Sequence, residues 1–249
     1  MGVGLQIIKM KKVIYILLFG TFALSSCKKV CNCTESTGVP AQETRTLSSF
    51  DKIYVDNNVN VVLSIGPQQV TVEGGKNLLP NITTNVSSGT LTLKNTNICN
   101  WLRSYKKSKI TVYVTTPTLT SITNNGVGVV SSADTLNIDS LDIKTLNAGD
   151  LDLIVKTRII TGHLFGPANL SLQGSCNNFF CTFFAGTGFV YCNNLSTSYT
   201  FLSSSTTGDC YVNVSGLFDV VINQLGNVYY TGNASVNKTI RGTGQLIHN

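Results

Sequence analysis

Glycines that precede short alternating strands recur through the second half of this 249-residue chain, and they limit its fold more than any other feature. The intervals between them are 23, 17, 20, 22, 18 and 18 residues. These glycines are Gly126, Gly149, Gly166, Gly186, Gly208, Gly226 and Gly244. A repeat near 20 residues that holds two or three short strands is typical of a β-solenoid, because no single coil can bury its inward side chains alone.

The residue usage also predicts an all-β fold. The chain has 30 Thr, 25 Asn and 22 Gly, but only 7 Ala and 3 Glu. Thr favours strands, whereas Asn and Gly favour tight turns. Residues 50–62 resemble residues 119–130 in their apolar and Asn-rich positions, so we expect the first half to join the same stack. The alternative architecture is an antiparallel β-sandwich, whose hairpins would need more regular two-residue turns.

The N-terminus has the pattern of a bacterial lipoprotein signal. Lys11 and Lys12 precede an apolar run, and Leu24-Ser25-Ser26-Cys27 resembles a lipobox, in which the cysteine receives lipid. The apolar run is too short to span a bilayer comfortably. We therefore predict a signal peptide at 1–26, a lipid on Cys27, a tether at 27–44 and a single solenoid domain at 45–249. Translation starts at either Met1 or Met10.

Removal of the signal lowers the apparent basicity of the chain. Lys9, Lys11 and Lys12 leave with it, so 15 basic residues face 12 acidic ones in the mature protein. A net charge of +3 gives no reason to expect a nucleic-acid partner.

Residues from Phe50 to about Val155 resemble the head GIN domain family, whose members are labelled auto-transporter adhesins. The similarity lies in F-D-K-I-Y-V, V-N-V-V-L-S-I-G, V-T-V-E-G, N-L-L-P-N-I, S-S-G-T-L-T-L, K-I-T-V-Y-V-T-T-P-T-L-T-S-I and N-N-G-V-G-V-V. The resemblance implies a right-handed parallel β-helix on secreted or surface-anchored lipoproteins. It carries no catalytic signature. The cysteine-rich and phenylalanine-rich section from Cys176 to Cys210 departs from the pattern.

Carboxylates of the repeat region do not form an obvious catalytic or metal site. Asp150 and Asp209 each follow a corner glycine, but they lie three coils apart, or about 15 Å at 4.8 Å per coil. Asp150 and Asp152 are close in sequence, and we expect both to point outward while Leu151 and Leu153 point inward. A polysaccharide lyase or hydrolase would need converging carboxylates. We therefore expect no enzyme activity, metal or cofactor, with a carbohydrate-active β-helix enzyme as the alternative.

Seven cysteines remain after Cys27 is lipidated, and their state is left open. They are Cys31, Cys33, Cys99, Cys176, Cys181, Cys192 and Cys210. The last four could bridge neighbouring coils in an oxidising envelope, or could fill the core as small apolar residues. We expect the nearby aromatic residues to be mostly core stacks, with some exposed. They are Phe179, Phe180, Phe183, Phe184, Phe189, Tyr191, Tyr199 and Phe201.

One basic aromatic segment is the candidate binding surface. It contains Trp101, Arg103, Tyr105, Lys106, Lys107 and Lys109. Aromatic rings beside cations could stack on sugars or meet anionic glycans, although a plain loop over one end of the solenoid is the simpler interpretation. We expect a lipid-anchored protein of the outer membrane that binds glycan or another envelope component without catalysis. A purely structural role is a further alternative.

Overall fold

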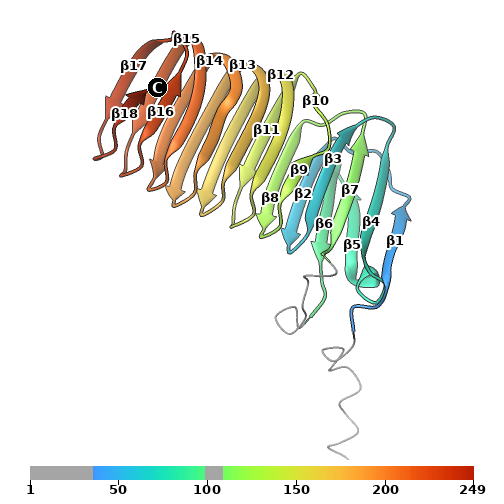
Figure 1. The fold of residues 1–249 in the computed structure, drawn as a ribbon. Helices are drawn as coiled ribbons and strands as arrows, with labels where there is room; N and C mark the ends of the chain where they lie inside the picture. Colours follow the sequence, from blue (N-terminus) through green and yellow to red (C-terminus); the bar gives the residue numbers. More distant parts are fainter. Residues whose placement is uncertain (1–35, 99–108) are drawn as a thin grey trace, which may run out of the picture. The chain divides into compact units, whose positions relative to one another are not determined.

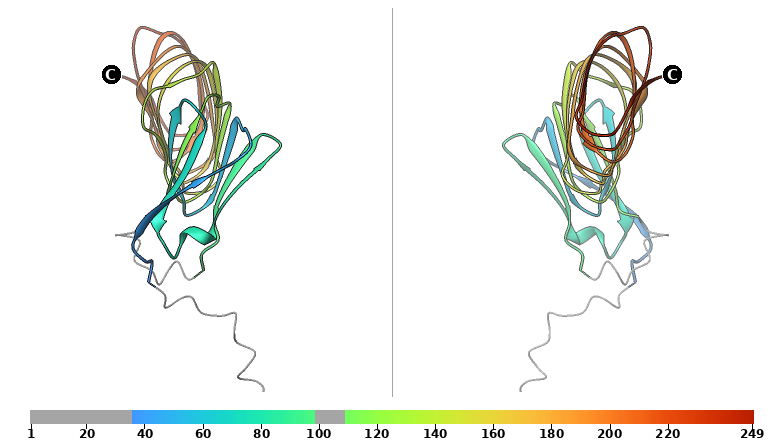
Figure 2. Two further views of the ribbon diagram at one scale, coloured as in Figure 1. Left: turned by 90° about the vertical axis from the view of Figure 1, so that its right-hand side faces the viewer. Right: turned by 90° about the vertical axis from the view of Figure 1, so that its left-hand side faces the viewer.

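Residues 36–98 and 109–249 are described by the computed structural model. The unit Ser36–Asn249 winds into a β-solenoid, as predicted, and its coils are flattened so that each has two faces (Figures 1 and 2). Among the described residues, no helix has the length and apolarity that a membrane span requires.

Face 1 contains the strands on one side of the coils. From the N-terminal end they are β1 (Pro40–Arg45), β4 (Gln69–Gly75), β7 (Thr111–Thr116), β3 (Asn60–Ile65), β9 (Val130–Ser132), the first halves of the long strands β12 (Leu151–Gly166), β13 (Leu170–Gly186), β14 (Val190–Thr206) and β15 (Cys210–Ile222), then β16 (Val228–Thr231) and β18 (Leu246–His248).

Face 2 contains the strands on the other side. In the same direction they are β5 (Ile82–Ser87), β6 (Thr90–Asn95), β2 (Lys52–Asn57), β8 (Ser121–Gly126), β11 (Ser140–Thr145), the second halves of β12 to β15, and β17 (Ser235–Ile240). The short β10 (Leu136–Asn137) pairs with β12 between the faces. A 3₁₀ turn, η1 (Leu79–Asn81), joins β4 to β5.

Parallel register stacks equivalent apolar residues into one column. Leu151 pairs with Leu170, which pairs with Val190, and the column continues to Cys210 in the next coil. These side chains are fully buried, as is Leu153. The expected inward direction of Leu151 and Leu153 is therefore confirmed. A continuous core of this kind lets each coil bury apolar surface that it could not bury alone.

The first half of the chain joins the stack, as predicted. Strand β2 pairs with β8 and β3 pairs with β9, so Ile53 lies beside Ile122 and Val61 beside Val130. Among the described strands, antiparallel pairing occurs only at the N-terminal end, where β1 pairs with β4, β4 with β7, and β5 with β6. The predicted tether boundary at Thr44 lies inside β1. This edge strand is polar and largely exposed, so its sequence lacks the alternation that marks the other strands.

The turn from face 2 back to face 1, which we call the glycine edge, explains the repeat. Residues 57–60, 126–129, 147–150, 166–169, 185–189, 206–209, 224–227 and 242–245 form it. At Gly188 a Cβ would lie 1.9 Å from the carbonyl oxygen of Ala168, and at Gly208 it would lie 2.2 Å from that of Gly188. Only glycine allows the backbones of successive coils to approach so closely.

Two neighbouring rows of residues run along this edge. In the second row, positions 128, 149, 168, 188, 208, 226 and 244 stack on one another, and all but Ala168 are glycines. Gly126, Gly166 and Gly186 belong to the first row instead. The uneven intervals between the seven glycines arise because Gly126, Gly166 and Gly186 belong to one row and the other four to the next. The opposite turn, from face 1 to face 2, is called the polar edge below.

Candidate binding face

Most of the predicted binding surface lies outside the described residues. This holds for Trp101, Arg103, Tyr105, Lys106 and Lys107, and also for Cys27 and the cysteines Cys31, Cys33 and Cys99. Lys109 is described, and it is exposed beside the buried Ile110 at the glycine edge. The described residues place a different group of aromatic side chains on face 1.

From β12 onward, a polar side chain precedes every described strand of face 1 except β14, which follows Phe189. The carboxylate of Asp150 accepts the main-chain N–H of Asn169 at 2.8 Å, and the Asn169 carboxamide accepts the N–H of Phe189 at 3.0 Å. In the same way, the carboxylate of Asp209 accepts the main-chain N–H of Asn227 at 2.8 Å, and the Asn227 carboxamide accepts that of Gln245 at 2.9 Å. Phe189 interrupts this ladder, because a phenyl ring offers no such acceptor to the next coil.

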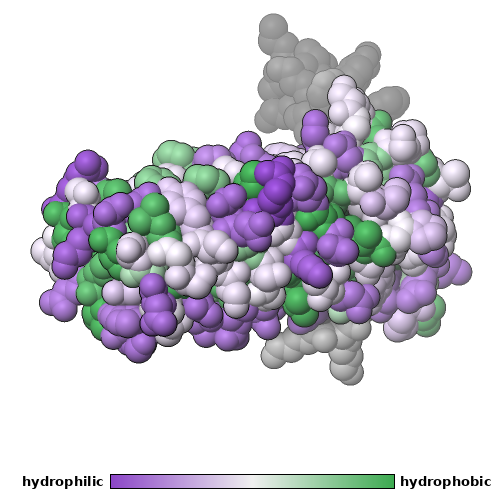
Figure 3. All heavy atoms as spheres, turned by 90° about the horizontal axis from the view of Figure 1, so that it is seen from above, coloured by the Kyte–Doolittle hydropathy of each residue, from purple (hydrophilic) through white to green (hydrophobic). Residues whose placement is uncertain are grey.

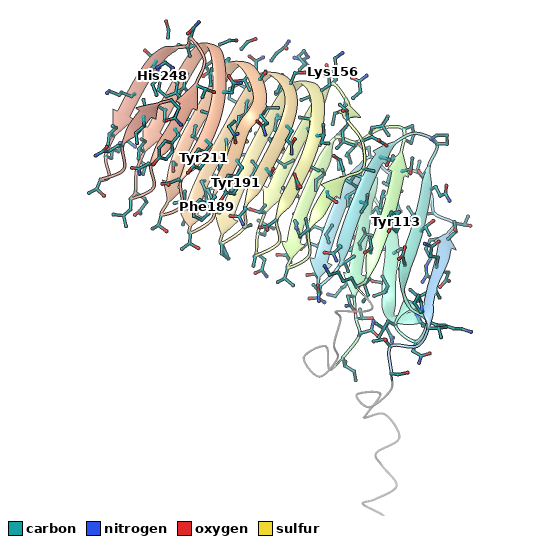
Figure 4. The ribbon with its side chains drawn as sticks, in the orientation of Figure 1. Tyr113, Lys156, Phe189, Tyr191, Tyr211 and His248 are labelled. Atoms are coloured by element: carbon teal, nitrogen blue, oxygen red, sulfur yellow. The ribbon has the colours of Figure 1, made fainter. Side chains whose placement is uncertain are left out.

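Beside Phe189, three tyrosines occupy the same position in three successive coils. Tyr191 pairs with Tyr211, and Tyr211 pairs with Tyr229. The ring centroids of Tyr191 and Tyr211 are 5.8 Å apart, and those of Tyr211 and Tyr229 are 4.9 Å apart, with the ring planes nearly parallel. The Phe189 ring stacks on Tyr191 at 5.7 Å. We call these four residues the tyrosine ladder; Figure 4 labels Phe189, Tyr191 and Tyr211 on the C-terminal coils.

The ladder is most open at its first rung. Tyr191 is 43% exposed and Phe189 is 36% exposed, whereas Tyr211 and Tyr229 are half-buried. In the preceding coil the residue paired with Tyr191 is Ser171, whose small side chain cannot cover an aromatic ring. Exposed ring surface of Phe189 and Tyr191 is therefore available at the step between these two coils.

The hydroxyl of Tyr211 stays protonated at neutral pH, so it can both donate and accept a hydrogen bond. Partial burial, and to a lesser extent the carboxylate of Asp209, raises the pKa of Tyr211. The Tyr229 hydroxyl accepts the side-chain amide of Asn227 at 3.4 Å. Apolar ring surface beside neutral donors and acceptors suits ligands that combine C–H faces with hydroxyl groups.

Two shallow grooves on the described surface are polar and not aromatic. One, of about 450 Å³, lies at the glycine edge and is lined mainly by asparagines such as Asn57, Asn95 and Asn97. Several of these amides bind one another or the main chain. The other, of about 480 Å³, lies at the polar edge beside Lys156 and Arg158. The tyrosine ladder thus provides the clearest place for stacking.

The aspartates considered for catalysis are spread along the stack. Asp150 and Asp209 lie in coils three apart, as predicted, and each carboxylate accepts a main-chain N–H. Asp152 is exposed. Within the ranges that the structure describes, no group of three or more His, Cys, Asp or Glu is arranged to hold a metal ion.

Four cysteines of the C-terminal half are free thiols in the core. They are Cys176, Cys181, Cys192 and Cys210. Burial raises the pKa of Cys176 to about 11 and that of Cys210 to about 12, and it raises the pKa of Cys181 and Cys192 as well. The sequence left two interpretations of these cysteines open. The structure supports the one in which they fill the core as small apolar residues, and not the one in which they bridge neighbouring coils.

The aromatic residues divide between core and surface. Phe179 and Phe183 are fully buried, whereas Phe184, Phe189 and Tyr191 are exposed. The sequence interpretation missed Tyr211 and Tyr229. Each ladder tyrosine comes three residues after a second-row glycine, namely Gly188, Gly208 or Gly226. Counting from Gly186, a first-row glycine, hides this regular offset.

Comparisons with known proteins agree with this architecture. The family model "Putative auto-transporter adhesin, head GIN domain" matches residues 49–234. An adhesin-named structure from Bacteroides fragilis has a TM-score of 0.77 at 22% identity, covering 85% of this chain and 97% of that one. One from Parabacteroides distasonis has a TM-score of 0.67 at 15% identity, with 85% and 98% covered.

A further Parabacteroides distasonis structure is named "Putative lipid binding protein". It has a TM-score of 0.62 at 16% identity, covering 86% of this chain and 98% of that one. No curated protein matches the chain. At these identities the solved structures support the fold alone, whereas the family model covers most of the sequence. The chain belongs to the head GIN domain family.

Proposed function

We propose that this protein is a lipid-anchored adhesin of the cell envelope that binds glycan at the tyrosine ladder without catalysing a reaction. The lipobox-like Leu24-Ser25-Ser26-Cys27 supports the anchor. The adhesin names of the family and of a solved structure with the same fold support a binding role at the cell envelope. A rigid stack of coils suits this role, because it holds its surface groups in place before a ligand arrives.

Phe189 and the aligned tyrosines are the observation that carries the proposal. Phe189 replaces an Asp or Asn that would bond the next coil, so its position is not explained by the hydrogen bonds of the edge. Three exposed or half-exposed tyrosines in register beside it are not needed for the core. Pyranose rings have apolar C–H faces that stack on such rings, and their hydroxyls bond the polar groups around them.

The positions and hydrogen bonds of the aspartates support a binding role without catalysis. Asp150 and Asp209 each accept a main-chain N–H, and they lie on different coils. A glycosidase would need two carboxyl groups within about 10 Å across a cleft.

A glycan array with the unit 36–249 tests the proposal, because this unit has its own continuous core. The best-bound neutral oligosaccharide is then titrated against the double variant Tyr191→Ser/Tyr211→Ser. We expect its affinity to fall at least about tenfold, because truncation of aromatic contacts at the centre of an interface commonly costs more than 1 kcal/mol.

Tyr113→Ser is the matched control. Tyr113 is also on face 1 and is 40% exposed, but it lies on β7, far from the ladder in the strand order (Figure 4). Equal losses in the control and in the ladder variant would contradict the proposed site. Binding by no glycan on the array would favour the purely structural role, and release of products from any oligosaccharide would favour the enzyme.

A further inference from the structure

Exposed apolar side chains gather along the glycine edge. Val127, Val129 and Leu225 lie in this edge, Leu146, Phe165 and Phe184 each lie one residue before it, and all six are exposed; we call them the apolar ridge. Phe165 is 37% exposed and Phe184 is 47% exposed, and their rings stack at 4.6 Å. Apolar surface that continues over neighbouring coils usually marks an interaction site.

The polar edge differs sharply from the glycine edge. Of the large apolar side chains that the structure describes, only Leu217 is exposed there. The same edge, in coils nearer the N-terminal end, carries Lys156, Asn177 and the ion pair of Arg158 with Asp139 at 2.9 Å. Figure 3 looks down on this edge, and Figure 4 labels Lys156 there. The same coils therefore expose apolar residues at one turn and polar residues at the other.

The described chain enters the fold at the glycine edge. The N–H of Lys76 binds the carbonyl of Val39 at 2.9 Å, and the side chain of Asn77 binds the carbonyl of Ser36 at 3.1 Å. Strand β4 ends at Gly75 beside these residues, at the same turn where β7 begins. Nine positions separate Ser36 from Cys27, and nine residues span at most about 30 Å. A lipid on Cys27 would therefore keep the N-terminal end of this edge within about 30 Å of the bilayer.

Charge at the glycine edge also favours a lipid surface. Lys76, Lys109 and Arg241 are exposed there. The aspartates of the edge are compensated: Asp56 forms an ion pair with Lys94 at 3.0 Å, and the half-buried Asp150 and Asp209 accept main-chain N–H groups. Exposed cations beside apolar side chains match the interface of a bilayer, where anionic headgroups lie above the acyl chains.

We propose that the glycine edge docks on the surface of an anionic bilayer, with the apolar ridge at the level of the headgroups and acyl chains. Docking in this orientation turns the polar edge away from the membrane. The choice of a bilayer as the partner rests on the proposed lipid anchor at Cys27. The vesicle experiment below uses the unit without the anchor, so its result does not depend on lipidation.

Flotation with vesicles of phosphatidylethanolamine and phosphatidylglycerol tests the docking. The unit 36–249 should float with these vesicles, less with phosphatidylcholine vesicles, and less as NaCl is raised. Phe165→Thr/Phe184→Thr should lower the partition coefficient about tenfold, because two exposed aromatic side chains no longer enter the interface. Leu217→Thr, which removes the exposed leucine of the polar edge, should float like the unchanged unit.

Three results would overturn the proposal. The unchanged unit could fail to float, or Leu217→Thr could weaken flotation as much as the ridge variant. Sedimentation could also show a dimer that Phe165→Thr/Phe184→Thr dissolves, in which case the ridge joins two copies. Circular dichroism of each variant checks the fold. Glycan titration of the ridge variant separates the two proposals, because the substituted residues are outside the tyrosine ladder.

Discussion

The glycine edge and the polar edge are built by the same coils, yet they obey different constraints. At the glycine edge, backbone stacks on backbone, and a Cβ at Gly188 or Gly226 would lie 1.9 Å or 2.0 Å from a carbonyl oxygen of the previous coil. Apolar side chains nevertheless remain exposed there. The polar edge exposes asparagine, serine and charged groups. The close stacking of backbones therefore explains the glycines of the glycine edge, but it does not explain the exposed phenylalanines there.

The largest expected difference in stability is between substitutions at two adjacent residues, one in the core and one in the apolar ridge. Phe183 is fully buried and Phe184 is 47% exposed. Phe183→Ala should lower the free energy of unfolding by about 3–5 kcal/mol, because it leaves a cavity in the core. Phe184→Ala should lower it by only about 1 kcal/mol, the loss of one exposed aromatic stack. Urea unfolding measures both, and a large loss in Phe184→Ala would show that the ridge is structural.

A smaller loss is expected when the backbone contact of the glycine edge is broken. Gly188→Ala places a methyl group against the carbonyl of Ala168 and should destabilise by up to about 3 kcal/mol. Gly162→Ala is the control, because a Cβ there meets its nearest atom at 3.5 Å, an ordinary contact. If thermal unfolding showed equal losses for both variants, the stacking of coils would not be the reason for glycine at this edge.

The smallest effect is expected at the polar edge. The Arg158 guanidinium, by hydrogen bonding, lowers the pKa of the exposed Asp139. A lowered pKa in the folded state adds stability above the unfolded pKa of about 3.9, and this contribution disappears as the pH falls. Because solvent screens the pair, Arg158→Ala should leave the urea midpoint at pH 7 unchanged within error. A clear shift would mean that the polar edge is a structural element as well.

The solenoid was predictable because its two signals are local. Glycines at about 20-residue intervals and the alternation of residues such as Leu151 and Leu153 follow from close backbone approach and from the strand period. Strand β1 was missed because it is polar on both sides and leaves no alternating pattern. The alternation in β4, β6 and β7 predicted strands but could not show that β4 pairs antiparallel with β7 and β5 with β6.

The candidate site was less predictable, because it depends on register between coils. Tyr191, Tyr211 and Tyr229 are about 20 residues apart, so they meet only when the correct glycine row sets the alignment. The predicted surface around Trp101 lies outside the described residues, apart from Lys109. The apolar ridge depends on the same register, since Leu146, Phe165 and Phe184 come from three different coils.

Hydroxyl-radical footprinting of the full chain on vesicles tests most directly whether the two edges face different surroundings. Its reference is the unanchored unit 36–249 in buffer. The account predicts slower oxidation of Leu146, Phe165 and Phe184 on vesicles, with Leu217 and Tyr113 oxidised at the same rate in both samples. Equal protection of Leu217, or unchanged oxidation of Phe165 and Phe184, would contradict the division between a membrane-facing edge and a free edge.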